Sequence, residues 1–310
     1  GAYDERGRAG TIILTQAELA GTTTIGPGHI TSLRLGSNAT ENYTFNNLVI
    51  ASGGTLEVDG NQFMNSGNGG AATINAASID VQGALKTDGL GFTADQGPGK
   101  SDYLWGGASH GSVGTDGSTP QAYINKPTYG DPINPTTIGS SGAVPGGGAV
   151  ILNVSGTVNV SGSLTSDGND IGWQGNGAGG SVNITAASLT GAGTIAARGA
   201  GTYVMNGNGS GGRISLYNVS SNSFSGTLSA NSADGGGAKT GTVIMSQTEM
   251  TGTLTLGSGG NINSLRLGSD SSNDYTFNNI VINSGGTLEI DSNPLKNGSG
   301  GGAAKIIAAN

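Results

Sequence analysis

Residues 148–152 read GAVIL, residues 180–184 read GSVNI and residues 212–216 read GRISL, so that one pattern recurs at intervals of 32 residues. A related segment, GTVIM, follows at 241–245. Apolar residues alternate with small or polar ones in each segment, which is the two-residue period of a β-strand with one buried face. The recurrence predicts equivalent strands that are stacked in register.

A second short apolar segment follows each of the first three. We take residues 157–160 (TVNV), 193–196 (GTIA) and 226–229 (GTLS) as equivalent strands. Glycine- and asparagine-rich stretches then close each unit, and no window has the 3.6-residue period of a helix. Strands in the same order in a unit of about 30 residues favour a parallel solenoid over a sandwich or a barrel. We therefore expect an all-β coil in which Val150, Val182 and Ile214 are vertical neighbours.

A longer repeat contains the shorter one. Residues 30–37 (ITSLRLGS) recur almost unchanged as residues 262–269 (INSLRLGS), at an offset of 232 residues. We divide the chain into one long repeat, residues 1–231, and the start of a second copy, residues 232–310. Tandem repetition predicts further copies in the same chain, or self-association of copies end to end or side by side.

The segments GGAVILNV, GGSVNIT and GGRISLY, each preceded by a glycine-rich loop, resemble the repeats of large secreted bacterial β-solenoid surface proteins. The filamentous-haemagglutinin-like adhesins are the nearest named class. This resemblance implies a right-handed parallel β-helix, export from the cell, and an adhesive or matrix role.

Composition narrows the classes of partner and compartment. Glycine accounts for 61 of 310 residues, only 10% of residues are charged, the net charge is −8, and there is no cysteine. A nucleic-acid partner would require a basic face, so we expect none. Disulfides are excluded, and no apolar run is long enough to span a membrane. The low-charge Gly/Ser/Thr/Asn composition favours an extracellular or cell-surface location.

One long excursion interrupts the 32-residue rhythm, at residues 89–147. It is rich in proline and aromatic residues, which predicts an ordered loop with a function. Two shorter glycine-rich loops leave the coil at the equivalent corner, so the three loops should lie side by side. Their aromatic rings could bind sugars or a neighbouring rod, or could pack the loops onto the coil itself. The candidate contact residues are Tyr103, Trp105, His110, Tyr129, Trp173 and Tyr203.

Acidic residues raise the question of catalysis. Asp88, Asp167, Asp170 and Asp234 recur near one corner, but each is next to glycine or asparagine, where Asp ordinarily stabilises a turn. No basic residue recurs with them. The sequence contains no EF-hand loop and no calcium-binding β-roll repeat. We therefore predict no enzyme, no cofactor and no metal, and we expect His110 to be solvated.

The sequence thus predicts a structural or adhesive extracellular β-solenoid that forms a stiff filament or surface fibre, with cell-surface glycans as a candidate partner. The alternative is a polysaccharide-binding or polysaccharide-degrading β-helix protein. An active site of that kind would need two or three acids clustered across neighbouring turns.

Overall fold

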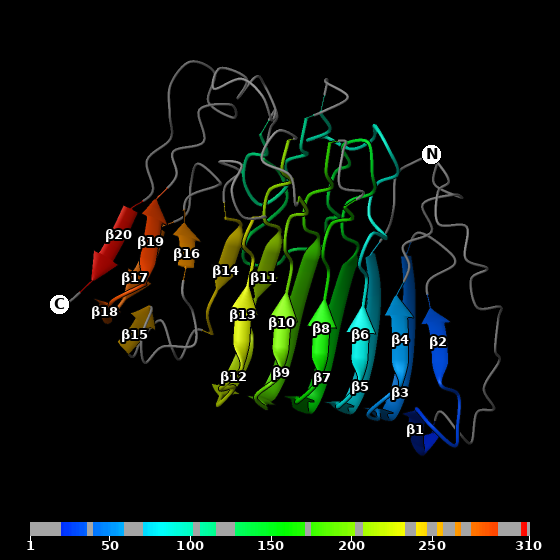
Figure 1. Cartoon of the computed structure of the whole chain (residues 1–310). Coiled ribbons are helices and arrows are strands. Elements are labelled where there is room, and N and C mark those ends of the chain that lie inside the picture. Colours follow the sequence, from blue (N-terminus) through cyan, green and yellow to red (C-terminus); the bar gives the residue numbers. More distant parts are fainter. Residues whose placement is uncertain are drawn as a thin grey trace.

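The structure is a computed structural model, and it describes most of the 310-residue chain. The described residues are 20–35, 40–58, 71–101, 106–115, 128–170, 175–201, 207–232, 240–246, 253–256, 264–267, 274–290 and 305–308. They form an almost entirely β structure with strands β1 to β20 (Figure 1). The all-β class expected from the repeat is confirmed.

Eight strands form a first sheet, in the order β1-β3-β5-β7-β9-β11-β14, with β12 also paired to β9. Their bounds are β1 Thr22–Ile25, β3 Thr40–Ile50, β5 Ala71–Val81, β7 Ala149–Val160, β9 Ser181–Thr190, β11 Arg213–Ser215, β12 Val219–Asn222 and β14 Thr242–Ile244.

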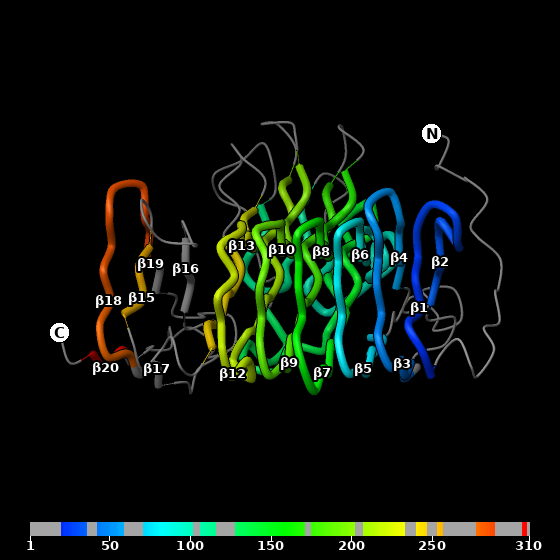
Figure 2. Tube along the Cα trace, turned by 90° about the horizontal axis from the view of Figure 1, so that it is seen from below, coloured from blue at the N-terminus to red at the C-terminus, as the bar shows by residue number. Residues whose placement is uncertain are grey.

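Six strands form a second sheet, in the order β13-β10-β8-β6-β4-β2. Their bounds are β2 Ser32–Leu35, β4 Thr55–Val58, β6 Ala84–Lys86, β8 Ser163–Thr165, β10 Thr194–Ala196 and β13 Thr227–Ser229. The chain passes from the first sheet to the second and back, and successive loops of the trace lie side by side (Figure 2). We call each strand of the first sheet, with the strand of the second sheet that follows it, a rung.

All of the strand pairs are parallel, and their registers follow the short repeat. Val150 is paired with Val182, which is paired with Ile214, which is paired with Val243. These four side chains are at most 1% exposed. The prediction that Val150, Val182 and Ile214 are neighbours in adjacent strands is therefore confirmed.

The second strand of each unit was predicted only in part. Residues 194–196 and 227–229 are paired with each other in the second sheet, as expected. Residues 157–160, however, are the second half of β7 in the first sheet, where Val158 is paired with Leu189 of β9. Their equivalence to residues 193–196 is therefore wrong. The strand that pairs with residues 194–196 in the second sheet is the shorter β8, which begins only three residues after β7 ends.

A gap in the burial pattern, at Gly156, explains this error. In β7 the buried side chains are Val150, Leu152 and Val154, and then Val158 and Val160, so one interval is doubled. The register of β7 shifts at this point relative to both neighbouring strands, as at a β-bulge. A long strand with such an irregularity resembles two separate strands when only its pattern is read.

One continuous core lies between the two sheets. Aliphatic side chains of both sheets belong to a single cluster of buried residues, in which like side chains stack from rung to rung. In the second sheet this stack is Leu56, Leu85, Leu164, Ile195 and Leu228. Stacking of this kind removes apolar surface from water at every rung, which is the main stabilising term for a protein interior.

The second copy repeats the strand pairs of the first. Its strands are β15 Thr253–Leu256, β16 Ser264–Leu267, β17 Asp274–Phe277, β18 Asn279–Ile282, β19 Thr287–Ile290 and β20 Lys305–Ala308. They form three parallel pairs, β15-β18, β16-β19 and β17-β20. Ser32 is paired with Thr55 in the first copy, and Ser264 is paired with Thr287 in the second, 232 residues later. The long repeat is thus a repeat of pairing register as well as of sequence.

Candidate functional site

The excursion begins after β6 and ends before β7, and its described parts, 89–101, 106–115 and 128–147, contain no strand. It contains two of the predicted contact residues that the structure describes, His110 and Tyr129. The other four, Tyr103, Trp105, Trp173 and Tyr203, lie outside the described residues. The structure brings His110 and Tyr129 together, with ring centroids 4.7 Å apart and ring planes tilted by 40°.

His110 is completely buried. Its Nδ1 lies 2.7 Å from the carbonyl oxygen of Gly179, and its Nε2 lies 2.8 Å from the hydroxyl of Thr137. Because a carbonyl oxygen only accepts, we assign the proton of the neutral ring to Nδ1, so that Nε2 accepts from Thr137. Burial, and then the positive charge of Arg213, lower the pKa of His110 to about 3. The expectation that His110 is solvated is therefore wrong, and its ring offers no surface to a partner in this structure.

Tyr129 is half-buried, and its hydroxyl is bonded within the excursion. The hydroxyl donates to the carbonyl oxygen of Ile138 at 2.6 Å and lies 2.7 Å from the hydroxyl of Ser140. Burial raises the pKa of this hydroxyl. These contacts agree with the alternative in which the ring packs its loop onto the protein.

Arg213 completes this cluster, and the sequence analysis missed it. It is the first residue of β11 and is fully buried. Its Nε and Nη2 donate to the carbonyl oxygen of Tyr129 at 3.0 and 2.8 Å, and its Nη1 donates to the hydroxyl of Thr242 at 3.0 Å. One signal was available in the sequence. The residues paired with Arg213 in β9 and β14 are the small Ser181 and Thr242, so Arg213 is a long cationic side chain at a position that is small in both neighbouring strands.

The glycine-rich loops after β6, β8 and β10 pack against one another as a bundle of extended segments. The N–H groups of Asn176 and Gly179 donate to residues of the segment 207–210. Those of Gly177 and Gly180 donate to residues of the segment 166–169. The bonds run from Asn176 to Gly207, Gly177 to Asn169, Ala178 to Ser140, Gly179 to Ser210 and Gly180 to Ser166. The prediction that the three loops lie side by side is confirmed.

This threefold alternation is what a polyproline-II-like chain produces, because it has three residues per turn and no internal hydrogen bonds. Glycine is required here for space. A Cβ on Gly179 would lie 2.3 Å from the carbonyl oxygen of Ala197, and one on Gly180 would lie 1.8 Å from that of Gly148. Neither residue has a positive φ, so the close approach of neighbouring backbones, rather than backbone conformation, excludes a side chain.

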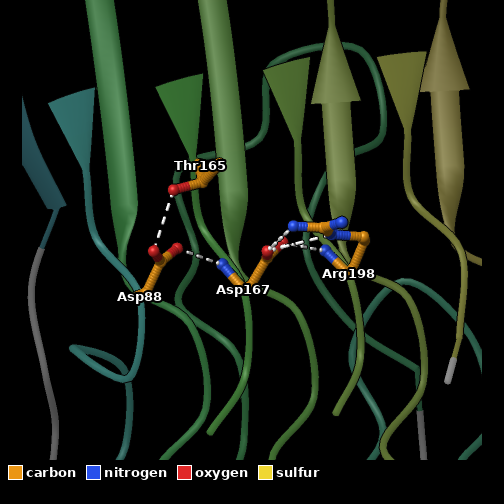
Figure 3. A network of polar contacts seen from close by, with 4 residues as sticks. All are labelled: Asp88, Thr165, Asp167 and Arg198. Carbon is orange, nitrogen blue, oxygen red and sulfur yellow. Dashed lines mark hydrogen bonds and ion pairs between the residues drawn. The ribbon is translucent and has the colours of Figure 1, made fainter. Parts of the chain in front are cut away.

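Two of the four acids predicted to share one corner, Asp88 and Asp167, meet there and are joined by a cation, whereas Asp234 lies outside the described residues. Asp88 accepts hydrogen bonds from the Thr165 hydroxyl at 2.9 Å and from the Asp167 N–H at 2.8 Å. Asp167 in turn accepts from the N–H of Arg198 and from its guanidinium, each at 2.6 Å (Figure 3). The observation that no basic residue recurs with these acids thus missed Arg198, which follows the next strand of the second sheet.

The geometry gives this corner a structural role. Each carboxylate accepts the backbone N–H of the next rung, so Asp88 and Asp167 link three consecutive rungs. Burial raises the pKa of Asp88, which is the direction expected of a carboxylate that is partly removed from water. Arg198 is half-exposed, so its ion pair with Asp167 contributes less than a buried pair would.

The described residues contain neither a cluster of metal ligands nor a membrane-spanning helix. No group of three or more His, Asp or Glu side chains among them is placed to bind a metal ion. No helix in the described part of the chain is long and apolar enough to cross a membrane.

Comparisons with known proteins add no further constraint. No protein-family model, no curated protein and no solved structure matches this chain. The function is therefore inferred from the residues and from their arrangement.

Proposed function

We propose that this chain is a segment of a right-handed parallel β-helix that serves as a structural or adhesive rod outside the cell. The rod forms by tandem repetition, and copies associate end to end or side by side. The haemagglutinin-like surface proteins, whose repeats the sequence resembles, would then be its functional counterparts. Its low-charge composition, rich in Gly, Ser, Thr and Asn, favours the extracellular location.

The observation that carries the proposal is the continuous parallel pairing of strands from rung to rung. Strands of the first sheet from β1 to β14 and strands of the second sheet from β2 to β13 are paired in chain order. Stability in such a stack comes from contacts between neighbouring rungs, so further rungs can be added to the rod through the same kind of contact. A right-handed path is proposed because parallel crossovers are right-handed in about 98% of cases.

The second copy supports continuation along the same axis. The pair β16-β19 has the register of β2-β4, and the pair β17-β20 places Tyr275 opposite Ile306 as β3-β5 places Tyr43 opposite Ile74. A fold that closes on itself has no place for a second set of identical pairs, whereas a rod accepts it.

The rival function, binding or cleavage of polysaccharide, would need carboxylates that are available to a substrate. The corner formed by Asp88, Asp167 and Arg198 comes nearest to this requirement. All four carboxylate oxygens there already accept hydrogen bonds from the protein. We therefore favour the rod.

Electron microscopy of the purified chain, and of the parent protein in its native setting, tests the proposal. The expected result is straight rods whose length increases with the number of long repeats. Compact particles of constant size would overturn it, particularly if the same material bound or shortened an oligosaccharide in a glycan array.

A further inference from the structure

Residues 128–141 of the excursion, which we call the brace, lie across the outer face of the first sheet. Going along the brace, its contacts pass from β11 to β9 and then to β7. Tyr129 contacts Arg213 of β11, Thr137 contacts Ser181 of β9, and Ile138 packs with Ala149 of β7. The brace therefore crosses three neighbouring strands instead of pairing with one.

The contacts of the brace are made by buried groups. The Ser181 hydroxyl donates to the carbonyl oxygen of Thr137 at 2.5 Å, and Ser181 is fully buried. The Ser215 hydroxyl, also fully buried, donates to the carbonyl oxygen of Ile133. Buried hydrogen bonds of this kind are costly to break singly, because the groups left behind lose their partners without regaining water.

These contacts differ in range from those of the stack. Residues paired between β9 and β11 are 32 positions apart, as Val182 and Ile214 are. The brace joins Tyr129 to Arg213, 84 residues away, and Ile133 to Ser215, 82 residues away. The brace precedes β7 in the chain but binds strands that come after it, so its contacts are independent of the ladder between rungs.

This independence matters because a stack of rungs can open from one end. Each rung contacts only its neighbours, so local opening in repeat proteins can proceed one unit at a time. A segment that is bound to three rungs changes this behaviour, because separating β11 from β9 also requires the brace to leave one of them.

We propose that the brace makes β7, β9 and β11 open as one cooperative unit, so that this part of the stack resists stepwise unravelling. The inference concerns a single chain. It therefore stands or falls independently of whether chains form filaments.

Hydrogen exchange of the isolated chain, measured by mass spectrometry, tests the brace. Arg213→Met removes the donors to Tyr129 and the donor to Thr242 of β14, and keeps most of the aliphatic volume. Amide exchange in both β9 and β11 should become roughly tenfold faster, because the free energy of opening falls by the net contribution of one or two buried hydrogen bonds. Arg198→Met is the matched control, because Arg198 is half-exposed and is bonded to Asp167 instead of the brace. It should leave β9 and β11 unchanged.

A milder variant covers the case in which Arg213→Met does not fold. Ser181→Ala removes one hydroxyl from β9, and cooperative opening predicts faster exchange in β11 as well as in β9. If only the amides near residue 181 respond, the three strands open separately and the proposal is wrong. It is also wrong if the brace loses protection in either variant while both strands keep theirs.

Discussion

The Nδ1 atom of His110 lies 2.7 Å from the carbonyl oxygen of Gly179, although 69 residues separate them in the chain. This bond joins the excursion to the glycine-rich loop before β9, and it requires a proton on Nδ1, while burial and the charge of Arg213 keep the ring neutral. The pKa of His110 is lowered from 6.5 to about 3 in the folded protein. Stability should therefore depend on pH in a definite direction.

Between pH 3 and 6.5 the unfolded chain binds one more proton at His110 than the folded chain does, so stability falls as the pH falls. The stabilising contribution of the neutral ring is complete above pH 6.5 and is lost progressively below it. The slope from this one group is about 1.4 kcal/mol per pH unit. Urea unfolding of wild type and of His110→Gln at pH 7 and pH 4 measures it. The stability gap should narrow in acid, and parallel losses in both proteins would contradict the assignment.

A second prediction concerns Asp88, whose pKa is raised by burial. The folded protein then holds its proton at higher pH than the unfolded chain does, so the ionised carboxylate costs stability above pH 3.8. Asn at this position can still accept from the Asp167 N–H. Asp88→Asn should therefore melt at the same temperature as wild type at pH 7, or at a higher one.

Asp88→Ala is the matched variant. It leaves the Asp167 N–H and the Thr165 hydroxyl without their acceptor, and it should lower stability by about 1–3 kcal/mol. Equal melting temperatures for the Asn and Ala variants would show that the carboxylate oxygens do not link these rungs.

The glycine-rich bundle predicts a contrast between two glycines. Gly179→Ala places a Cβ against the backbone of Ala197, and overpacking of this kind should cost about 2–3 kcal/mol. At Gly28, with φ +86°, a Cβ meets nothing within 4 Å, so Gly28→Ala should cost only the left-handed backbone penalty of about 1 kcal/mol. Chemical denaturation of both variants gives the order, and a cheaper Gly179→Ala would contradict the close packing of the loops.

The stacked core yields a fourth prediction. Leu164 is fully buried and is paired with Leu85 on one side and Ile195 on the other. Leu164→Ala should destabilise the protein by about 2–5 kcal/mol, through lost burial and the cavity left in the column. Leu164→Ile should be tolerated, because isoleucine already occupies the next rung. Thermal unfolding of both variants tests this, and equal losses would mean that shape matters more than volume at this position.

The repeating sequence pattern was enough to predict the register of the stack. Val150, Val182 and Ile214 follow a two-residue burial pattern at a fixed spacing, and a slip of one residue would turn every apolar side chain outward. Periodicity of this kind is local information, and it was sufficient to predict parallel strands, while direct recurrence of residues 30–37 at 262–269 predicted the long repeat. It failed at residues 157–160, because an irregularity within β7 looks like the start of a new strand.

The contacts of the excursion, by contrast, became visible only in the folded chain. Periodicity does not extend to a segment that crosses the strands, so nothing in residues 128–141 predicts contact with residues that lie up to 84 positions away. Burial of His110 and the role of Arg213 depend on that crossing. A repeat determines how each rung pairs with the next. A segment that occurs once in the long repeat is positioned by the shape of the surface and by its hydrogen-bonding partners, and both form only when the rungs have assembled.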